Sequence, residues 1–203
     1  MKIYENIEQR SEEWYNLRKG KLTASEFHTL LGNSTTKENL LLKKTAERLN
    51  PNYTESFLSN PDIERGIELE AQARLLYEME TGQEVKEIAF CEVDDFVGCS
   101  PDGLIGEDGI IEIKCPKDTV FIDQVIKDKI KPEYYTQIQF NLLCLEKQFC
   151  DYIAYNENYP LFVKRIERDE EHIAKIKDAI EECKKKILNN IEIFTNKLLT
   201  TKQ

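Results

Sequence analysis

Two short motifs in the middle of the chain hold the residues best suited to chemistry. Ser100-Pro101-Asp102-Gly103 is followed, ten residues after the aspartate, by Glu112-Ile113-Lys114. On a strand alternate side chains share a face, so Glu112 and Lys114 lie side by side, and the turn at Asp102 can bring a second carboxylate to them. Two converging carboxylates need a cation between them, and oxygen ligands of this kind suit Mg²⁺ or Mn²⁺. The spacing favours metal-assisted phosphodiester hydrolysis with Lys114 acting on the attacking water; a salt-bridged hairpin without catalytic function is the alternative.

Composition excludes several other kinds of chemistry. The six cysteines contain no Cys-x-x-Cys pair and no zinc-ligand spacing, so free and buried thiols are expected. The two histidines, His28 and His172, belong to no recognisable metal motif. Catalysis is therefore expected to rest on carboxylates, a lysine and a hard metal ion.

Length and hydropathy indicate one domain in an aqueous compartment. A chain of 203 residues fits a single domain. Its apolar runs are interrupted by charge and fall far short of the roughly 20 residues that a membrane-spanning helix needs. The N-terminal segment also lacks the apolar stretch and cleavage site of a secretory signal. We therefore expect a cytoplasmic protein without a membrane partner.

Caps, breakers and periodicity predict the elements that must position the two motifs. Helices are expected at 11–19 after Ser11, at 23–32 after a Thr23/Glu26 capping box, at 38–49, and from Asn60-Pro61 to about Glu80. Further along, strands are expected at 85–91, 95–99, 103–106, 110–115, 149–156 and 161–167, with a hairpin turn at 107–109. Helices at 119–129 and 132–146 and an amphipathic helix at about 169–199 complete the pattern. The order of elements predicts an α/β fold with a mixed central β-sheet flanked by helices.

Three further motifs accompany the two central ones. They are Trp14-Tyr15-Asn16-Leu17-Arg18-Lys19-Gly20 with Thr23-Ala24-Ser25, then Gly66-Ile67-Glu68-Leu69-Glu70, and finally Tyr134-Tyr135-Thr136-Gln137-Ile138-Gln139. In this order the five motifs, spanning 14–139, resemble those of the lambda exonuclease and YqaJ-like viral recombinase family of the PD-(D/E)XK nuclease superfamily. The resemblance implies a restriction-endonuclease-like core and a single nuclease domain over 1–203, with the motif-bearing part at about 11–167.

The resemblance also implies roles for individual residues. Asp102, Glu112 and the main-chain carbonyl of Ile113 would hold the metal, Glu70 would be the third acidic member of the site, and Lys114 would act on the water. Gly66 is expected to permit close approach of the helix that carries Glu70. A surface carboxylate beside Arg74 is the alternative reading of Glu70.

Four other positions match a pocket that, in the resembled family, binds the terminal 5′ phosphate. They are Arg18, Ser25, Ser100 and Gln137. The chemistry is suitable, because arginine offers a planar fork to phosphate while hydroxyl and amide groups add neutral hydrogen bonds. The alternatives are a helix-end cation for Arg18 and ordinary structural hydrogen bonds for Ser25 and Gln137. Trp14 is expected to be a core anchor.

The function implied by the resemblance is a Mg²⁺-dependent 5′-to-3′ exonuclease on double-stranded DNA ends, with Mn²⁺ able to substitute. It would release mononucleotides and leave 3′ single-stranded tails for phage-type recombination. A homotrimeric ring, DNA with 5′-phosphorylated ends and a single-strand annealing protein are the implied partners. Two alternatives stay open: a nuclease of the same fold with another polarity or endonuclease activity, and a catalytically silent DNA-binding protein.

The net charge of −10 first argues against a DNA partner, since DNA-binding proteins usually carry a basic footprint. Residues 51–112, however, contain three basic and sixteen acidic residues and include Glu70, Asp102 and Glu112. Part of the acidity is therefore expected to be a cation site, and the rest a solvated acidic surface. The basic residues of the flanking segments, Lys19, Lys21, Lys127, Lys129 and Lys131, are expected to face the phosphates.

Overall fold

The computed structural model describes residues 1–32, 34–53 and 61–200. A five-stranded sheet forms its centre, in the order β3-β6-β7-β8-β9. In this sheet β7 and β8 are parallel and the other neighbours antiparallel. The bounds are Val85–Lys86 for β3, Gly103–Ile105 for β6, Gly109–Lys114 for β7, Phe149–Ala154 for β8 and Phe162–Glu167 for β9.

A smaller sheet adjoins the first, in the order β1-β4-β5-β2. Its strands are β1 (Lys2–Tyr4), β4 (Phe90–Glu92), β5 (Val97–Cys99) and β2 (Leu22–Thr23). The chain leaves this sheet at the end of β5 and enters the five-stranded sheet at the start of β6. The connection is Ser100-Pro101-Asp102, so the motif that the sequence marks as chemical lies between the two sheets.

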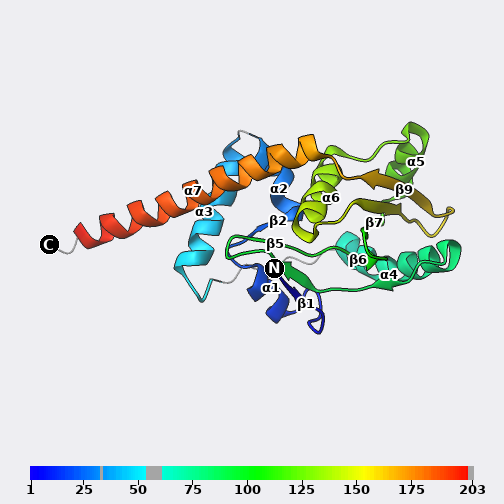
Figure 1. The fold of residues 1–203 in the computed structure, drawn as a ribbon, viewed down its shortest axis with the longest axis horizontal. Helices are drawn as coiled ribbons and strands as arrows, with labels where there is room; N and C mark the ends of the chain where they lie inside the picture. The colour runs from blue at the N-terminus through cyan, green and yellow to red at the C-terminus, as the bar shows by residue number, and fades with distance from the viewer. Residues whose placement is uncertain (33, 54–60, 201–203) are drawn as a thin grey trace.

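Helices cover both faces of the central sheet (Figure 1). Their bounds are Glu12–Arg18 for α1, Ala24–Leu31 for α2, Thr35–Leu49 for α3, Pro61–Thr81 for α4, Asp118–Lys127 for α5, Pro132–Leu145 for α6 and Glu170–Thr200 for α7. On one face, Leu69, Ala73 and Tyr77 of α4 pack against Ile111 and Ile113 of β7. The connection from β7 to its parallel neighbour β8 runs through α5 and α6, as a parallel pair requires.

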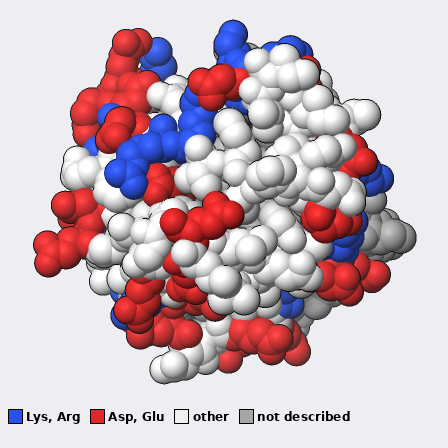
Figure 2. Space-filling view, turned by 90° about the vertical axis from the view of Figure 1, so that its right-hand side faces the viewer, with Lys and Arg blue, Asp and Glu red and all other residues white. Residues whose placement is uncertain are grey.

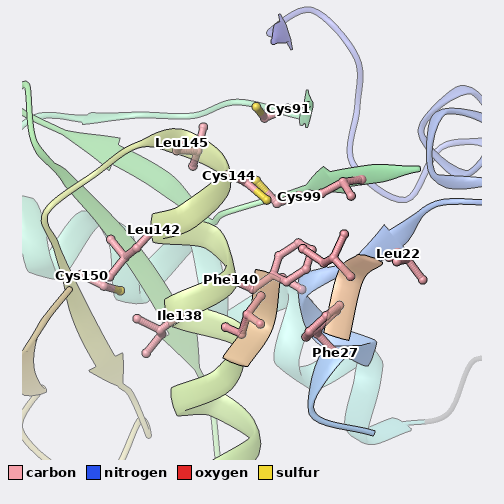
Figure 3. Packing of buried hydrophobic residues seen from close by; sticks show 14 of the residues in the cluster. Leu22, Phe27, Cys91, Cys99, Ile138, Phe140, Leu142, Cys144, Leu145 and Cys150 are labelled. Atoms are coloured by element: carbon pink, nitrogen blue, oxygen red, sulfur yellow. The ribbon is translucent and has the colours of Figure 1, made fainter. Parts of the chain in front are cut away.

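The larger apolar core lies on the opposite face and joins α2, α6 and α7 to both sheets. Figure 3 shows Phe27 of α2 and Phe140 of α6 packed together, with ring centroids 4.6 Å apart. Ile110 of β7 belongs to this core, whereas Ile111 and Ile113 belong to the other. The period-two alternation predicted for this strand is therefore confirmed, and Glu112 shares the face of Ile110.

The α/β class with helices around a mixed sheet is confirmed, and all six cysteines are free, five of them buried. The strand predicted at 85–91 is wrong as a single element, because β3 and β4 lie in different sheets. The helix predicted at 38–49 begins earlier, at Thr35, because the Ser34 hydroxyl accepts from the backbone N–H of Lys37. Asn60 lies outside the described residues. In the described part of the chain, no helix is long and apolar enough to cross a membrane.

Candidate active site

Asp102 is fixed to the central sheet by a backbone hydrogen bond. The N–H of Ile113 donates to Oδ2 of Asp102 across 2.6 Å. Gly103 begins β6 directly after Asp102, and a Cβ at Gly103 would lie 2.3 Å from Cγ1 of Val85 on the neighbouring strand β3. Glycine is thus required at this position, and the turn brings Asp102 beside Glu112. Burial raises the pKa of Asp102 to about 8, and the negative charges of Glu112 and Glu70 add to that effect.

Glu112 is completely buried and is held by three donors. Its Oε1 accepts from Lys114 Nζ and, at 2.6 Å, from Nε2 of Gln137. Its Oε2 accepts from Nδ2 of Asn141 at 3.2 Å. Gln137 and Asn141 are four residues apart on α6, so both side chains project from one face of that helix. An isolated buried carboxylate is very unfavourable, and these donors make this one tolerable.

Lys114 lies at the end of β7 between the carboxylates and an aromatic ring. Its ammonium pairs with Glu112 and lies 5.3 Å from the ring centroid of Tyr134. Burial alone would lower the pKa of Lys114, but Glu112 and Asp102 outweigh burial and raise the pKa above its ordinary value. Lys114 is therefore a cation at neutral pH. In that state it can orient a water molecule and neutralise charge, rather than accept a proton.

Glu70 projects from α4 and is held by two arginines. Nη2 of Arg10 donates to its Oε2 at 2.8 Å, and Nη2 of Arg74 donates to its Oε1 at 3.3 Å. Glu70 is close enough to Asp102 to raise the pKa of that carboxyl group. The expected close approach at Gly66 is wrong, because a Cβ there would meet no heavy atom of the described residues within 4 Å. The contact with Arg74 that the sequence offered as an alternative is present, and Arg10 joins it.

The oxygen atoms at the site suit a hard divalent cation, although they do not form a complete set of ligands. Among the described residues, no three His, Cys, Asp or Glu side chains form a ready metal-binding group. Asp102 and Glu112 nevertheless supply two adjacent carboxylates, and Oδ1 of Asn141 is buried beside them without a partner in the described structure. Because all of these atoms are oxygen, they match Mg²⁺ or Mn²⁺ better than a soft metal. A cation here would relieve the repulsion that raises the pKa of Asp102.

Arg18, Ser25 and Ser100 come together as predicted. Arg18 donates from Nη1 to Oγ of Ser100 at 3.2 Å, and from Nη2 to Oγ of Ser25 at 3.4 Å. Its guanidinium lies over the ring of Trp14, 4.2 Å from the centroid. Trp14 is an anchor, since its Nε1 donates to the carbonyl of Ala89 at 2.9 Å and to Oγ of Ser100 at 3.1 Å. The guanidinium of Arg18 thus lies between the ring of Trp14 and the hydroxyl groups of Ser25 and Ser100, and it also donates to Oγ1 of Thr23.

Gln137 does not join this group in the structure. Its amide donates to Glu112 instead, so Gln137 belongs with the carboxylates. Three further residues, Asn141, Thr23 and Arg10, contact the site residues but were not predicted to do so from the sequence. The position of Asn141 four residues after Gln137 on a predicted helix was the signal available for Asn141, because that spacing places both side chains on one face. Arg10 gave no signal, because it reaches Glu70 from sixty residues away in the chain.

Two cavities flank the site. One of about 590 Å³ lies beside Glu70 and is lined in part by Arg10, Arg74 and Glu87. The other, of about 550 Å³, is lined in part by Arg18, Thr23, Glu26 and Lys44. The second cavity gives solvent and small anions a route to the guanidinium of Arg18.

The expected phosphate-facing lysines are only partly available. Lys21 is buried, pairs with Glu92 at 2.8 Å and donates to the carbonyls of Asp94 and Asp95, so that expectation is wrong for Lys21. Lys127 is exposed but pairs with Asp123 at 2.6 Å. Figure 2 shows a face whose centre is largely uncharged, with acidic side chains in separate patches mainly towards its edges and Lys and Arg in a few short groups.

A mixed sheet with Asp102 in the turn before β6, and with Glu112 and Lys114 on the adjacent strand β7, is the arrangement expected of the PD-(D/E)XK class. The family model of the YqaJ-like viral recombinase domain matches residues 13–148. Since this match covers well over half of the chain, the protein belongs to the YqaJ-like viral recombinase family. No curated protein matches the sequence significantly.

Solved structures give the same result for the fold. The chain is similar to an alkaline exonuclease, LHK-Exo, from Laribacter hongkongensis, with 34% identity, a TM-score of 0.88, and coverage of 94% of this chain and 100% of that one. The same values hold for LHK-Exo in complex with dAMP. A phage-related exonuclease from Haemophilus somnus 129PT shares the fold at 20% identity and a TM-score of 0.72, with 88% of this chain and 98% of that one covered.

Proposed function

We propose that this protein is a Mg²⁺-dependent exonuclease that degrades one strand of duplex DNA from its 5′ end. The observation that carries the proposal is the short segment Ser100-Pro101-Asp102. Its first residue contacts Arg18 and its last is bonded to the strand of Glu112. Ser100, beside an arginine suited to a terminal phosphate, and Asp102, in a carboxylate pair suited to a hydrolytic metal, are thus two residues apart in the chain. Family membership and the likeness to exonucleases support the more general part of this proposal, namely that the protein is a nuclease of exonuclease type.

Each residue has a defined task in this proposal. Asp102, Glu112 and the carbonyl of Ile113 would hold the cation, with Glu70 as a further acidic group. When bound there, a divalent cation supplies Lewis acidity towards the scissile phosphate and makes water a better nucleophile. Lys114 orients that water and offsets negative charge. Gln137 and Asn141 fix the orientation of Glu112, as partners behind metal ligands commonly do.

The pocket around Arg18 would hold the terminal 5′ phosphate. Arg18 and Trp14 both donate to Oγ of Ser100, so the proton of that hydroxyl can be directed at an anion. A terminal phosphate bound there places the next phosphodiester near Asp102, which favours release of mononucleotides. The complex of LHK-Exo with dAMP, a deoxynucleoside monophosphate, supports that product.

The remaining parts of the proposal concern assembly and location. We propose a single cytoplasmic nuclease domain that works as a homotrimeric ring, leaves 3′ single-stranded tails and hands them to a single-strand annealing protein. Exposed apolar side chains on the last turns of α7, such as Phe194 and Leu198, support contact with another chain. In Figure 1 these turns extend beyond the body of the molecule.

One experiment separates an exonuclease from an endonuclease and from a silent DNA-binding protein. Linear and covalently closed circular duplexes of the same sequence are incubated with the protein in Mg²⁺, Mn²⁺ or EDTA. The proposal expects loss of the linear duplex only, in either metal and not in EDTA. Cutting of the closed circle would favour an endonuclease, and binding without digestion in any metal would favour a silent DNA-binding protein.

A further inference from the structure

Thr23 is the residue directly before α2, but its side chain does not cap that helix within the described structure. Its hydroxyl donates instead to Oε2 of Glu26 at 2.8 Å, and its own Oγ1 accepts from Nη2 of Arg18 at 3.3 Å. The predicted capping box is therefore wrong in its main feature. A residue positioned to stabilise a helix end has its hydroxyl committed to an arginine and a carboxylate.

Glu26 is itself held in place by a buried lysine. Nζ of Lys44 lies 2.9 Å from Oε2 of Glu26 and 3.5 Å from Oε2 of Glu47. Thr23 and Lys44, which both contact Glu26, are buried at 1% and 4% exposure, whereas the side chain of Glu26 is 24% exposed. Burial by itself would raise the pKa of Glu26, but Lys44, Thr23 and Arg18 together lower it below its ordinary value. Glu26 is consequently a fixed acceptor, and it determines where the proton of Thr23 points.

Because the hydroxyl proton of Thr23 is directed to Glu26, Oγ1 of Thr23 serves only as a hydrogen-bond acceptor towards Arg18. Among the described residues, the hydrogen-bond acceptors recorded for Arg18 are the hydroxyl oxygens of Thr23, Ser25 and Ser100. A carboxylate in direct contact would compete with an incoming phosphate for the same N–H groups, because charge-assisted hydrogen bonds are the stronger kind. Thr23 places one hydroxyl between Glu26 and the guanidinium. Thr23 thereby orients Arg18, and the nearby charge of Glu26 supports the positive charge of Arg18 without a direct ion pair between them.

We propose that Thr23, held by Glu26, is a positioning residue that orients Arg18 for the terminal phosphate and so sets the preference for phosphorylated over unphosphorylated 5′ ends. This inference rests on the proposed function, since it assigns Arg18 to the terminal phosphate. Thr23 acts through Arg18 and does not donate to the phosphate itself.

The test compares the binding of two DNA ends by full-length variants. Dissociation constants are measured by fluorescence anisotropy, in EDTA to prevent metal-dependent hydrolysis, for one duplex with either a 5′ phosphate or a 5′ hydroxyl. Thr23→Val removes the hydroxyl at nearly constant volume, and Thr23→Ser restores it. Thr45→Val is the matched control, because it removes another buried threonine hydroxyl, one that donates to the Leu41 carbonyl inside α3 at 2.8 Å. Arg18→Ala alone and with Thr23→Val completes a double-mutant cycle.

We expect Thr23→Val to lower the ratio of the dissociation constant for the 5′-hydroxyl duplex to that for the 5′-phosphate duplex by about fivefold to tenfold, the effect of one ordinary hydrogen bond. Thr23→Ser and Thr45→Val should keep the wild-type ratio, and Thr23→Val should have no further effect on the ratio in the Arg18→Ala background. An unchanged ratio in Thr23→Val, a wild type that binds both ends equally, or an undiminished effect without Arg18 would each overturn the inference. Because the ratio is measured without hydrolysis, a failure of the proposed 5′-to-3′ polarity would appear separately, in the digestion products.

Discussion

Nε2 of Gln137 on α6 lies 2.6 Å from Oε1 of Glu112 on β7. This contact places Gln137 behind the carboxylates, whereas its position in the sequence motif suggested a role at the terminal phosphate. The two assignments differ in what loss of the amide should do, so a substitution can decide between them.

Gln137→Leu should slow hydrolysis about 10- to 100-fold, the usual effect of removing a partner behind a metal ligand. The loss should be equal for 5′-phosphorylated and 5′-hydroxyl ends, as measured by initial rates on the two duplexes. Gln139→Leu is the control on the same helix, since Gln139 donates to the carbonyl of Glu167, away from the carboxylates. A loss confined to phosphorylated ends would return Gln137 to the phosphate pocket.

Arg18→Ala should reduce the preference for 5′-phosphorylated ends by about tenfold or more, because a charge-assisted contact to phosphate is removed. The Mg²⁺ concentration for half-maximal rate should stay the same, since Arg18 does not contact the carboxylates. Arg48→Ala serves for comparison: Arg48 also stacks on an aromatic ring, that of Phe96, at 3.8 Å, but lies outside the pocket. If Arg18→Ala kept the full preference, the pocket would be assigned wrongly.

The raised pKa of Asp102 predicts how the stability of the metal-free protein depends on pH. The folded state holds the Asp102 proton up to about pH 8, whereas the unfolded chain releases it near its ordinary pKa of about 3.9. Between these values the folded state binds more protons, so the free energy of unfolding falls as the pH rises. The melting temperature in EDTA should therefore drop between about pH 6 and 8 in wild type, and drop less in Asp102→Asn.

Mg²⁺ should reverse this trend. A cation binds the ionised carboxylate, so its stabilising effect should grow as the pH rises. The measurement is thermal unfolding with and without Mg²⁺ at the two ends of that pH range. The assignment of Asp102 as a ligand would be refuted if Mg²⁺ stabilised wild type and Asp102→Asn equally at the higher pH.

A buried hydrogen bond away from the site tests the packing of α4 on the sheet. The hydroxyl of Tyr77 donates to Oδ2 of Asp151 on β8 at 2.7 Å, and Arg165 pairs with the same carboxylate. Tyr77→Phe should lower the free energy of unfolding by about 1.5–3 kcal/mol, as loss of a hydrogen bond to a charged group does. Urea unfolding measures this change, and the rate of hydrolysis per folded molecule should not change. A change below about 0.5 kcal/mol would show that this bond contributes little.

The central part of the site could be predicted from the sequence because its geometry is local. The alternation of residues along β7 placed Glu112 and Lys114 on one face, and Pro101 and Gly103 marked the turn at Asp102. The helices were also predictable to within a few residues, since caps and breakers such as Ser11 and Gly32 lie next to the elements they bound.

Partners distant in the chain could not be predicted in this way. Lys21 was expected to face phosphates, but in the fold it pairs with Glu92, which lies far away in the sequence. Thr23 resembled a capping residue until α3 brought Lys44 to Glu26 and fixed the carboxylate that takes the hydroxyl proton. β1 pairs with β4, some ninety residues later, and local sequence carries no sign of that pairing.

The most direct test of the account follows the first nucleotide released. A linear duplex carries different labels in its 5′-terminal and 3′-terminal nucleotides, with a phosphate on each 5′ end, and mononucleotides are collected over time in Mg²⁺. We predict early release of the 5′ label as a deoxynucleoside monophosphate and retention of the 3′ label while strands shorten. With EDTA or Asp102→Asn, neither label should be released. Early release of the 3′ label, or release that continues in Asp102→Asn, would contradict it.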